Sequence, residues 1–324
     1  MLRFGVLGAA RIAPAALLEP AQNLPGVEVV AIASRDPQRA RPLADRYGVP
    51  RVCTYGELYA DPEVDAIYVA LPASAHADAA LHALDAGKHV LVEKPFASNA
   101  GQAKRVVAAA QAAGRVCAEA FHWRYHPLAA RIQEAVRELG ALEEVDAGFT
   151  VEIPTEDEVR HAYALSGGAL MDLGCYALQW VRFVHPAGEP RVVRARMREG
   201  APRVDVETEV ELAYPDGTAA KVLTSMSAGT ERRAWLRVVG ERGTLEVDNP
   251  LAPHTGHELR LELDGALRRE TVDDDETTYQ HQLRAFLDAV ESGTPLPTGG
   301  DDAIATLELI DAAYKAAGLP LRGV

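Results

Sequence analysis

The alternation of short apolar runs with helix-like segments over the first 120 or so residues constrains the fold most strongly. Apolar runs of this length are typical of buried strands, and they lie at 4–7, 27–33, 66–71, 89–92 and 115–118. Sequence typical of helices lies between them, at 12–23, 37–47, 76–86 and 99–114. Apolar strands that alternate with helices form a parallel sheet covered on both faces. We therefore predict that the chain begins with an α/β domain of this kind.

A different pattern follows Pro127. After a helix-like segment at 128–139, apolar and polar residues alternate as they do in half-buried strands. The predicted strands lie at 143–153, 191–197, 206–214, 219–225, 235–239 and 258–263, and helices are predicted at 279–291 and 301–317. Proline, aspartate and glycine at 215–217 indicate a hairpin between two of these strands. Because 324 residues exceed the usual size of one domain, we predict a second domain with an antiparallel, half-solvated sheet.

The composition limits the partners of the chain. Asp and Glu total 47 against 33 Lys and Arg, so the formal net charge is −14 and nucleic acid is disfavoured as a partner. No apolar stretch reaches the roughly 20 residues that span a membrane. Arg11 and Pro14 interrupt the N-terminal apolar run, which would otherwise imitate a secretory signal. Three well-separated cysteines suit a reducing compartment. We therefore expect a cytoplasmic protein with neither a membrane nor a nucleic-acid partner.

Two polar clusters are not expected to be sites. His254 and His257 have side chains that bind metals, but they lie in a loop of proline and glycine without further ligands nearby. The acidic stretch at 273–276 is typical of a solvated loop. We predict no metal.

The first predicted strand leads into a turn typical of dinucleotide binding. Such a turn brings backbone amides at a helix N-terminus close to a pyrophosphate. Here it would consist of Gly8, Ala9, Ala10, Arg11, Ile12 and Ala13. The usual fingerprint carries three glycines, whereas alanine occupies the second and third positions in this chain. An ordinary strand-to-helix turn is the alternative interpretation.

The end of the second predicted strand bears on the choice of nicotinamide cofactor. An acidic residue at this point would accept hydrogen bonds from the ribose hydroxyls of NAD. This chain has Ser34 and Arg35 instead, with Arg39 one helical turn further on. A hydroxyl and two guanidinium groups suit the 2′-phosphate of NADP, which arginine binds with charge-assisted hydrogen bonds. We predict NADP, and NAD remains the alternative because Asp36 could bind the ribose.

Three longer motifs carry a family resemblance. Glu93-Lys94-Pro95 follows one predicted strand, EAFHWRYHP occupies 119–127, and SGGALMDLGCY occupies 166–176. Together with GVLGAARIA near the start and LPASAH at 71–76, these motifs resemble the Gfo/Idh/MocA oxidoreductases over nearly the whole chain.

The resemblance implies an α/β architecture in three parts. An N-terminal Rossmann domain would occupy 1–121, and a substrate-binding α/β domain with a large, mostly antiparallel sheet would occupy 122–300. A last helix within 301–324 would pack back on the Rossmann domain. The second sheet would join copies of the chain into a homodimer or a homotetramer.

The resemblance also implies the catalytic residues. Many members carry Asp-x-x-x-His where this chain has Asp172-x-x-x-Tyr176, a spacing that matches the aldose and dihydrodiol dehydrogenase branch. By resemblance, Lys94 lies beside the nicotinamide ribose and the substrate hydroxyl. A free tyrosine has a pKa of about 10, and a nearby ammonium group lowers it. Tyr176 is therefore predicted to be the general acid and base and Lys94 its electrostatic partner, with Lys94 as the base itself as the alternative. Asp172 would orient the reacting groups or bind a sugar hydroxyl, or would merely cap a helix.

The remaining predicted contacts surround these three residues. Arg160 would contact the substrate or form a surface ion pair, and His76 would touch the nicotinamide half or be a hydrogen-bonded structural residue. Trp123 would line the cofactor cleft or pack in the core, and Ala73 replaces an asparagine that commonly contacts the cofactor. The predicted cofactor contacts are Gly8, Ala9, Ala10, Arg11, Ile12, Ser34, Arg35, Arg39, Leu71, Pro72, His76, Glu93, Lys94, Trp123 and Arg124. The predicted substrate contacts are Arg160, Asp172 and Tyr176.

These residues predict an NAD(P)-dependent oxidoreductase that transfers a hydride between nicotinamide and an aldose, a cyclic polyol or a diol. A redox-neutral NAD-dependent glycosidase is one alternative, since some relatives have that activity. A non-catalytic NADPH-binding sensor is another, although a sensor would not need Lys94, Asp172 and Tyr176.

Overall fold

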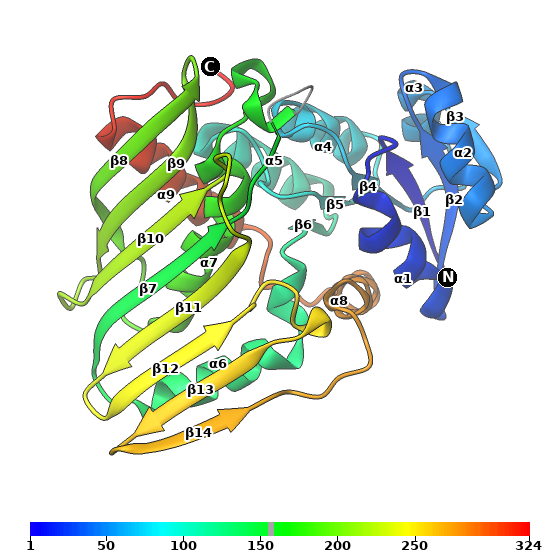
Figure 1. The fold of residues 1–324 in the computed structure, drawn as a ribbon. Helices are drawn as coiled ribbons and strands as arrows, with labels where there is room; N and C mark the ends of the chain where they lie inside the picture. Colours follow the sequence, from blue (N-terminus) through cyan, green and yellow to red (C-terminus); the bar gives the residue numbers. More distant parts are fainter. Residues whose placement is uncertain (155–158) are drawn as a thin grey trace. The chain divides into compact units, whose positions relative to one another are not determined.

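The computed structural model describes residues 1–154 and 159–324 of the chain. Two compact units are present (Figure 1). Unit 1 comprises Met1–Tyr125 and Thr277–Ile304, and unit 2 comprises His126–Glu276 and Ala305–Val324. The domain boundaries expected from the sequence, and the packing of the last helix, stay predictions.

Unit 1 contains the predicted parallel sheet. Its strands are β1 (Leu2–Leu7), β2 (Val27–Ala33), β3 (Arg51–Cys53), β4 (Ala66–Val69), β5 (His89–Val92) and β6 (Cys117–Glu119). They are ordered β3-β2-β1-β4-β5-β6, and every neighbouring pair is parallel. Chain order reverses between β1 and β4, and this arrangement defines the Rossmann fold with its ligand crevice at the reversal. The prediction of a Rossmann fold is confirmed.

The helices of unit 1 cover this sheet and complete its core. They are η1 (Pro14–Leu18), α1 (Glu19–Asn23), α2 (Pro37–Tyr47), α3 (Tyr55–Ala60), η2 (Ala73–Ala75), α4 (His76–Asp85), α5 (Ala100–Ala113), η3 (His122–Tyr125) and α8 (Thr278–Ser292). α8 is encoded far from the others, yet Phe286 packs against Phe4 of β1 with their ring centroids 5.6 Å apart. Leu283 and Leu287 belong to the same buried cluster. Unit 1 therefore needs a segment that lies between the two stretches of unit 2 in the sequence.

Unit 2 is built on a mixed sheet of eight strands. They are β7 (Leu142–Thr150), β8 (Arg191–Ala201), β9 (Val204–Ala213), β10 (Ala219–Ser225), β11 (Arg233–Gly240), β12 (Gly243–Asp248), β13 (Glu258–Leu263) and β14 (Ala266–Glu270). Their order is β14-β13-β12-β11-β7-β10-β9-β8. β7 and β10 are parallel, and the other neighbouring pairs are antiparallel. A large, mostly antiparallel sheet is thus confirmed.

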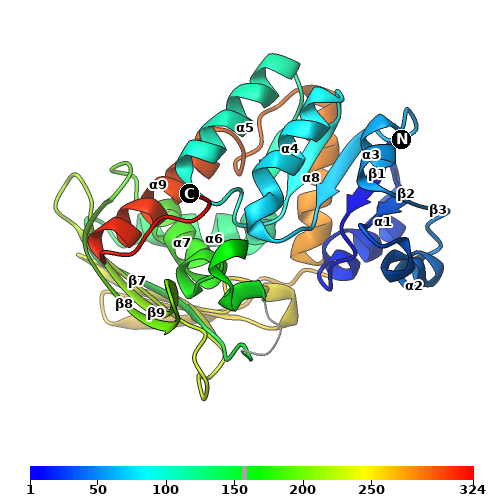
Figure 2. The ribbon, with the colours of Figure 1, turned by 90° about the horizontal axis from the view of Figure 1, so that it is seen from above.

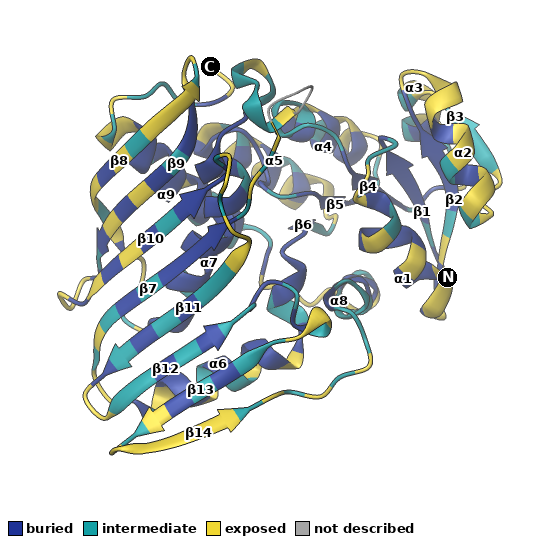
Figure 3. Cartoon of the chain, viewed as in Figure 1, coloured by how far each residue is buried: buried dark blue, intermediate teal, exposed yellow. Residues whose placement is uncertain are grey.

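The two faces of this sheet differ in character. α6 (Pro127–Glu138) and α7 (Cys175–Val184) lie on one face (Figure 2). Buried positions alternate with half-buried or exposed ones along several of its strands (Figure 3). Val145 and Leu236 are among the buried residues. Polar side chains at the other positions carry cross-strand ion pairs, including one of 3.7 Å between Arg237 and Glu246. Among the described residues, no helix combines the length and the apolar character needed to cross a membrane.

Among the described α-helices and strands, four were not predicted from the sequence. β3 and α3 are short, so their periodicity is hard to detect. β12 begins at Gly243 directly after a tight turn, and β14 is an exposed edge strand of largely charged sequence. The first helix begins at Pro14 rather than at residue 12, because proline is favoured in the first turn of a helix.

Acidification is expected to destabilise unit 1 through His89. Its Nδ1 accepts a hydrogen bond from the Val116 amide at 3.0 Å, so this nitrogen must be unprotonated. Burial lowers the pKa of His89, and the charge of Arg115 adds to this effect. Below about pH 6.5 the unfolded chain binds this proton more readily than the native protein, so the free energy of unfolding should fall as the pH decreases. His89→Gln retains an acceptor that does not titrate and should weaken this dependence. Urea unfolding midpoints from pH 5 to 8 would contradict the prediction if both proteins showed the same slope.

Candidate active site

The predicted cofactor residues of unit 1 follow the carboxyl ends of its strands. Gly8 follows β1, Ser34 follows β2, Leu71 follows β4 and Lys94 follows β5. Trp123 lies in η3, shortly after β6. The carboxyl ends of parallel strands meet at one edge of a sheet, so these residues gather where Rossmann folds bind dinucleotides.

The turn after β1 fits the role of a phosphate-binding turn. Gly8 has φ +109°, and a Cβ atom there would lie 2.4 Å from the carbonyl oxygen of Ala70. The Gly8 amide donates to the Ala33 carbonyl at 2.9 Å, which fixes the turn against β2. Ala13 is fully buried, as the third position of the fingerprint requires for close packing of helix and strand. Arg11 and Ile12 are exposed at the tip of the turn.

The end of β2 presents arginines beside an aspartate that has a structural role. The carboxylate of Asp36 accepts a hydrogen bond from the Gln38 amide at 3.0 Å and so caps α2. Ser34 is buried, whereas Arg35 and Arg39 are exposed. Within the described part of the chain, neither arginine forms an ion pair. The cap reduces the capacity of Asp36 to bind a ribose, and both guanidinium groups are accessible to an anion.

The segment that contains Lys94 is held from several neighbouring positions. The Phe96 amide donates to the buried Glu119 carboxylate at 2.7 Å. On the other side, the Tyr68 hydroxyl donates to the Glu93 carboxylate at 2.6 Å. The peptide bond between Lys94 and Pro95 is cis. These contacts fix the backbone on both sides of Lys94, which lies half-buried at the end of β5.

His76 connects this segment to the loop after β4. Its Nδ1 lies 2.8 Å from the Pro95 carbonyl oxygen, and its Nε2 lies 2.7 Å from that of Leu71. Burial lowers the pKa of the ring. Because both nitrogens face backbone carbonyls, the geometry favours the structural role for His76 over direct contact with nicotinamide.

The motif at 119–127 also has a packing function. The Trp123 side chain is 1% exposed, and the Arg124 guanidinium lies 5.8 Å from the centre of its ring. His122 contacts α8 through a 2.7 Å hydrogen bond between its Nδ1 and the Thr278 hydroxyl. Trp123 therefore packs in the core, and the half-buried Arg124 is the more accessible member of this pair.

In unit 2, Asp172 and Tyr176 lie on one continuous helical segment. η6 (Leu170–Gly174) is a π-helical turn, and it leads directly into α7. Single π-helical turns are frequent at functional sites. Residues four apart lie on the same side of a helix, so the two side chains share a face. The residue at the helix N-cap is Ala169, so the alternative role of Asp172 as a helix cap is wrong.

Arg160 forms an ion pair with Asp172. Its Nε lies 2.7 Å from Oδ2 of the carboxylate. Gly167 makes the approach possible, because a Cβ atom there would lie 2.4 Å from the Arg160 carbonyl oxygen. The Gly168 amide then donates to that same oxygen at 2.9 Å. The two glycines of the motif thus bring a guanidinium group to Asp172.

Tyr176 belongs to an aromatic cluster beneath the sheet. Its ring contacts Phe149 of β7 edge to face, with the centroids 6.0 Å apart. On the other side it stacks with Trp180 at 6.2 Å. Tyr176 is 6% exposed, so its ring is held in place by packing.

A buried ion pair behind the Gly-Gly motif was missed by sequence reasoning. Asp205 and Arg322 are fully buried and lie 3.0 Å apart. Asp205 also accepts hydrogen bonds from the Tyr314 hydroxyl at 2.8 Å and the Leu170 amide at 2.7 Å. No sequence signal indicated this pair, because Asp205 occupies the same alternating position as three outward-facing glutamates of β9, Glu207, Glu209 and Glu211. Arg322 lies near the end of the chain, outside any recognisable motif.

The fold and these residues together define a class of protein. A Rossmann sheet with a dinucleotide turn, joined to a second α/β unit that carries Asp172 and Tyr176, is the arrangement of a nicotinamide-dependent oxidoreductase. Residues 2–121 match the oxidoreductase family with an NAD-binding Rossmann fold, and residues 129–246 match the GFO/IDH/MocA C-terminal domain. The chain belongs to the Gfo/Idh/MocA family, as the motifs predicted.

The similarity extends over the whole length of known enzymes. The chain is 36% identical to D-xylose 1-dehydrogenase (NADP(+)) 2 of Haloferax volcanii, covering 98% of this chain and 97% of that protein. It is 34% identical to a dTDP-3,4-didehydro-2,6-dideoxy-alpha-D-glucose 3-reductase of Streptomyces violaceoruber, covering 98% and 96%. The chain is thus an NAD(P)-dependent dehydrogenase or reductase acting on CH–OH groups, and NAD(P) binds through its Rossmann domain.

Two solved structures are similar over the same extent. The aldose-aldose oxidoreductase of Caulobacter crescentus, solved with glycerol, has a TM-score of 0.90 at 27% identity and covers 98% of this chain and 97% of its own. A mutant of a 3-ketoreductase from Actinomadura kijaniata, solved with TDP-benzene and NADP, has a TM-score of 0.90 at 29% identity and covers 97% of each chain.

Proposed function

We propose that this chain is an NADP-dependent dehydrogenase or reductase of an aldose, a cyclic polyol or a diol. The observation that carries this proposal is the set formed by Arg160, Asp172 and Tyr176, in which an ion pair orients a carboxylate on the helix face that also bears a phenol. A carboxylate and a phenol can bind and deprotonate neighbouring hydroxyls of a polyol. The sugars and diols named for the relatives support this substrate class.

In the proposed mechanism, each of these residues has one task. A bound nicotinamide would supply or accept the hydride at the carbon that carries the reacting oxygen. Tyr176 removes the hydroxyl proton during oxidation and returns it during reduction. The ammonium group of Lys94 stabilises the phenolate and so lowers the pKa of Tyr176. Asp172 accepts a hydrogen bond from a second hydroxyl of the substrate, and the ion pair with Arg160 orients this carboxylate.

The test is an absorbance assay for reduced nicotinamide with NADP or NAD and a panel of aldoses, inositols and cyclic diols. A substrate-dependent rise in absorbance with NADP is the expected result. The proposal would be overturned if the protein binds the cofactor but neither oxidises any compound of the panel nor reduces any of the corresponding carbonyl compounds. Cleavage of a glycoside without net reduction of NAD would instead indicate the redox-neutral alternative.

The preference for NADP is expected to reverse in the double variant Ser34→Asp/Arg35→Ala. The new carboxylate would repel the 2′-phosphate and accept a ribose hydroxyl, while one guanidinium is lost. A charge-assisted hydrogen bond contributes roughly 1.5–3 kcal/mol, so the ratio of kcat/KM for NADP over NAD should fall at least about tenfold. Arg46→Ala, in the last turn of α2, is the control and should leave the ratio unchanged. An unchanged ratio in the double variant would show that the 2′-phosphate is recognised elsewhere.

We further propose that the polar face of the sheet in unit 2 joins two or four copies of the chain, and that the protein acts in the cytoplasm. Its alternating ion pairs, such as that between Arg196 and Glu209, form a regular surface that a second copy could match. None of the three cysteines forms a disulfide bond in the structure, which suits a reducing compartment. Light scattering after size-exclusion chromatography tests the assembly, and a monomer at micromolar concentration would contradict it.

A further inference from the structure

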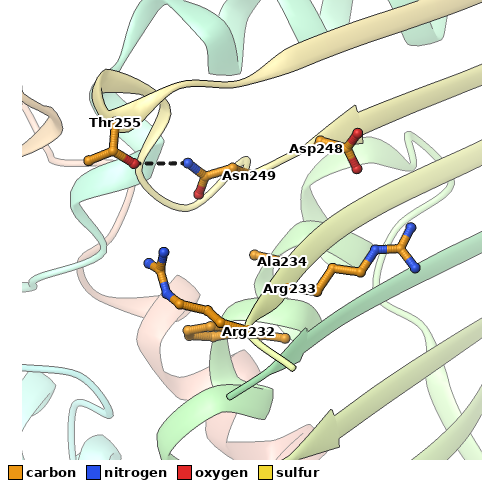
Figure 4. Close-up of a pocket in the computed structure, with 7 residues that line it drawn as sticks. Arg232, Arg233, Ala234, Asp248, Asn249 and Thr255 are labelled. Carbon is orange, nitrogen blue, oxygen red and sulfur yellow. Dashed lines mark hydrogen bonds between the residues drawn. The ribbon is translucent and has the colours of Figure 1, made fainter. Parts of the chain in front are cut away.

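A pocket of about 290 Å³ lies wholly within unit 2, where β11 begins and β12 ends (Figure 4). Its lining combines two arginines with one aromatic ring and the start of a loop. The lining residues are Phe149, Arg232, Arg233, Ala234, Asp248, Asn249 and Thr255.

The pocket lies next to the aromatic cluster that holds Tyr176. Phe149 lines the pocket, and the same ring contacts Tyr176 with their centroids 6.0 Å apart. Ala234 is paired with Phe149 in the sheet. A substrate whose reacting hydroxyl lies at Tyr176 could therefore extend past Phe149 into this pocket.

One wall of the pocket is a preorganised loop. The side-chain amide of Asn249 donates to the Ala252 carbonyl at 2.9 Å and to the Gly256 carbonyl at 2.7 Å. The Thr255 hydroxyl donates to the Ala252 carbonyl at 2.8 Å. His257, which follows this loop, has its ring nitrogens within 3.0 Å of the Pro253 carbonyl oxygen and the Val272 amide. The polar side chains of the wall therefore bond to the loop itself, and recognition falls to the arginines.

The arginines give the pocket a local positive charge. In Figure 4 the Arg232 side chain extends toward Asn249 and Thr255, whereas Arg233 extends the other way. No carboxylate among the residues that the structure describes forms an ion pair with Arg232. The charge of Asp248 is offset by Arg260, 3.3 Å away. In a chain with a net charge of −14, an exposed guanidinium group directed at a pocket wall attracts an anion.

We propose that this pocket is a substrate subsite that binds a phosphoryl group on the sugar, with the guanidinium of Arg232 as its anchor. A guanidinium group matches two phosphate oxygens at once, and 290 Å³ is large enough for more than a carboxylate. The proposal rests on the proposed function and narrows its substrate class to phosphorylated sugars. The phosphoryl group could belong to a sugar monophosphate or to the diphosphate of a nucleotide sugar.

Binding measurements test the subsite without relying on catalysis. Wild type and Arg232→Gln are titrated calorimetrically with inorganic phosphate, pyrophosphate and dTDP, in the presence of saturating NADP so that the cofactor site is filled. Arg137→Gln, which removes an exposed arginine from α6 of the same unit, is the matched control. The expected result is binding of at least one anion by wild type and the control, and a roughly tenfold or greater weakening in Arg232→Gln. Tighter binding of dTDP would indicate a nucleotide sugar, and tighter binding of phosphate would indicate a monophosphate.

Kinetics then compare glucose with glucose 6-phosphate and with glucuronate, and xylose with xylose 5-phosphate. Wild type should show a KM for the phosphorylated sugar at least about tenfold below that for the neutral one, and Arg232→Gln should remove this difference while kcat stays within about twofold. Equal binding of all anions by wild type and Arg232→Gln would overturn the subsite, as would a preference for glucuronate. If anions bind at Arg232 but no sugar reacts, the proposed function fails while the subsite stands.

Discussion

Replacement of Lys94 by alanine should lower kcat by roughly 10²–10⁴-fold, the range typical of groups that assist proton transfer, while NADP still binds. The reason is electrostatic, because without the ammonium group the phenol of Tyr176 should keep its proton at neutral pH and be a poor base. The turn that holds Lys94 does not depend on its side chain, since it is fixed through the Phe96 amide and the Glu93 carboxylate. Steady-state kinetics and fluorescence titration with NADPH measure the two quantities separately.

The pH profile distinguishes the two roles that Lys94 could have. If Lys94 lowers the pKa of Tyr176, then kcat of Lys94→Ala should recover as the pH rises toward 10, because the phenol then ionises unaided. If Lys94 is itself the base, no such recovery should occur. Lys104→Ala, which removes an exposed lysine from α5, is the control and should behave as wild type. Turnover of Lys94→Ala close to that of wild type would remove Lys94 from the mechanism.

Replacement of Arg322 by methionine should lower the free energy of unfolding by about 3–5 kcal/mol, because it leaves the Asp205 carboxylate buried without its counter-charge. The variant should also lower turnover. Arg322 donates to the Gly167 carbonyl at 2.7 Å, and Asp205 accepts from the Leu170 amide. Both contacts hold the segment that leads into Asp172. Urea unfolding measures the free energy of unfolding, and steady-state kinetics measures turnover. Hydrogen exchange of residues 166–176 shows whether this segment has become more mobile.

Two further variants separate the buried pair from a generic loss of charge. Arg269→Met removes an arginine that is 59% exposed and paired with Glu258, so it should cost less than about 1 kcal/mol. Asp205→Asn combined with Arg322→Met removes both charges and should recover part of the lost stability. An effect of Arg322→Met no larger than that of Arg269→Met would contradict the importance of the buried pair.

Local sequence was sufficient to predict the bounds of a helix or strand where the signals that define it lie within the segment itself. β2, β5, β10, β13 and α2 have the bounds that were predicted, because their apolar periodicity and their capping residues act within a few positions. The β9–β10 hairpin was likewise indicated by its proline, aspartate and glycine. The family followed from three motifs in order, and the match of residues 2–121 and 129–246 to this family confirms it.

Pairing and packing over long sequence distances could not be predicted in this way. The parallel pairing of β7 with β10 depends on which strands lie between them in the sheet, and no short-range pattern encodes it. The exposed strand β14 takes its structure from hydrogen bonds to β13, since its own sequence is charged.

The amino-acid sequence by itself determined the Rossmann pattern, the nicotinamide-dependent class and the residues that are candidates for the chemistry, because each rests on a local motif. Only the tertiary structure decided how these candidates are held. It pairs Arg160 with Asp172, ties His76 to the segment after Lys94, and surrounds Tyr176 with Phe149 and Trp180. It also places Arg322 against Asp205, more than a hundred residues earlier in the chain. The physical reason is that burial and charge pairing depend on which surfaces meet in three dimensions, and residues distant in sequence supply those surfaces.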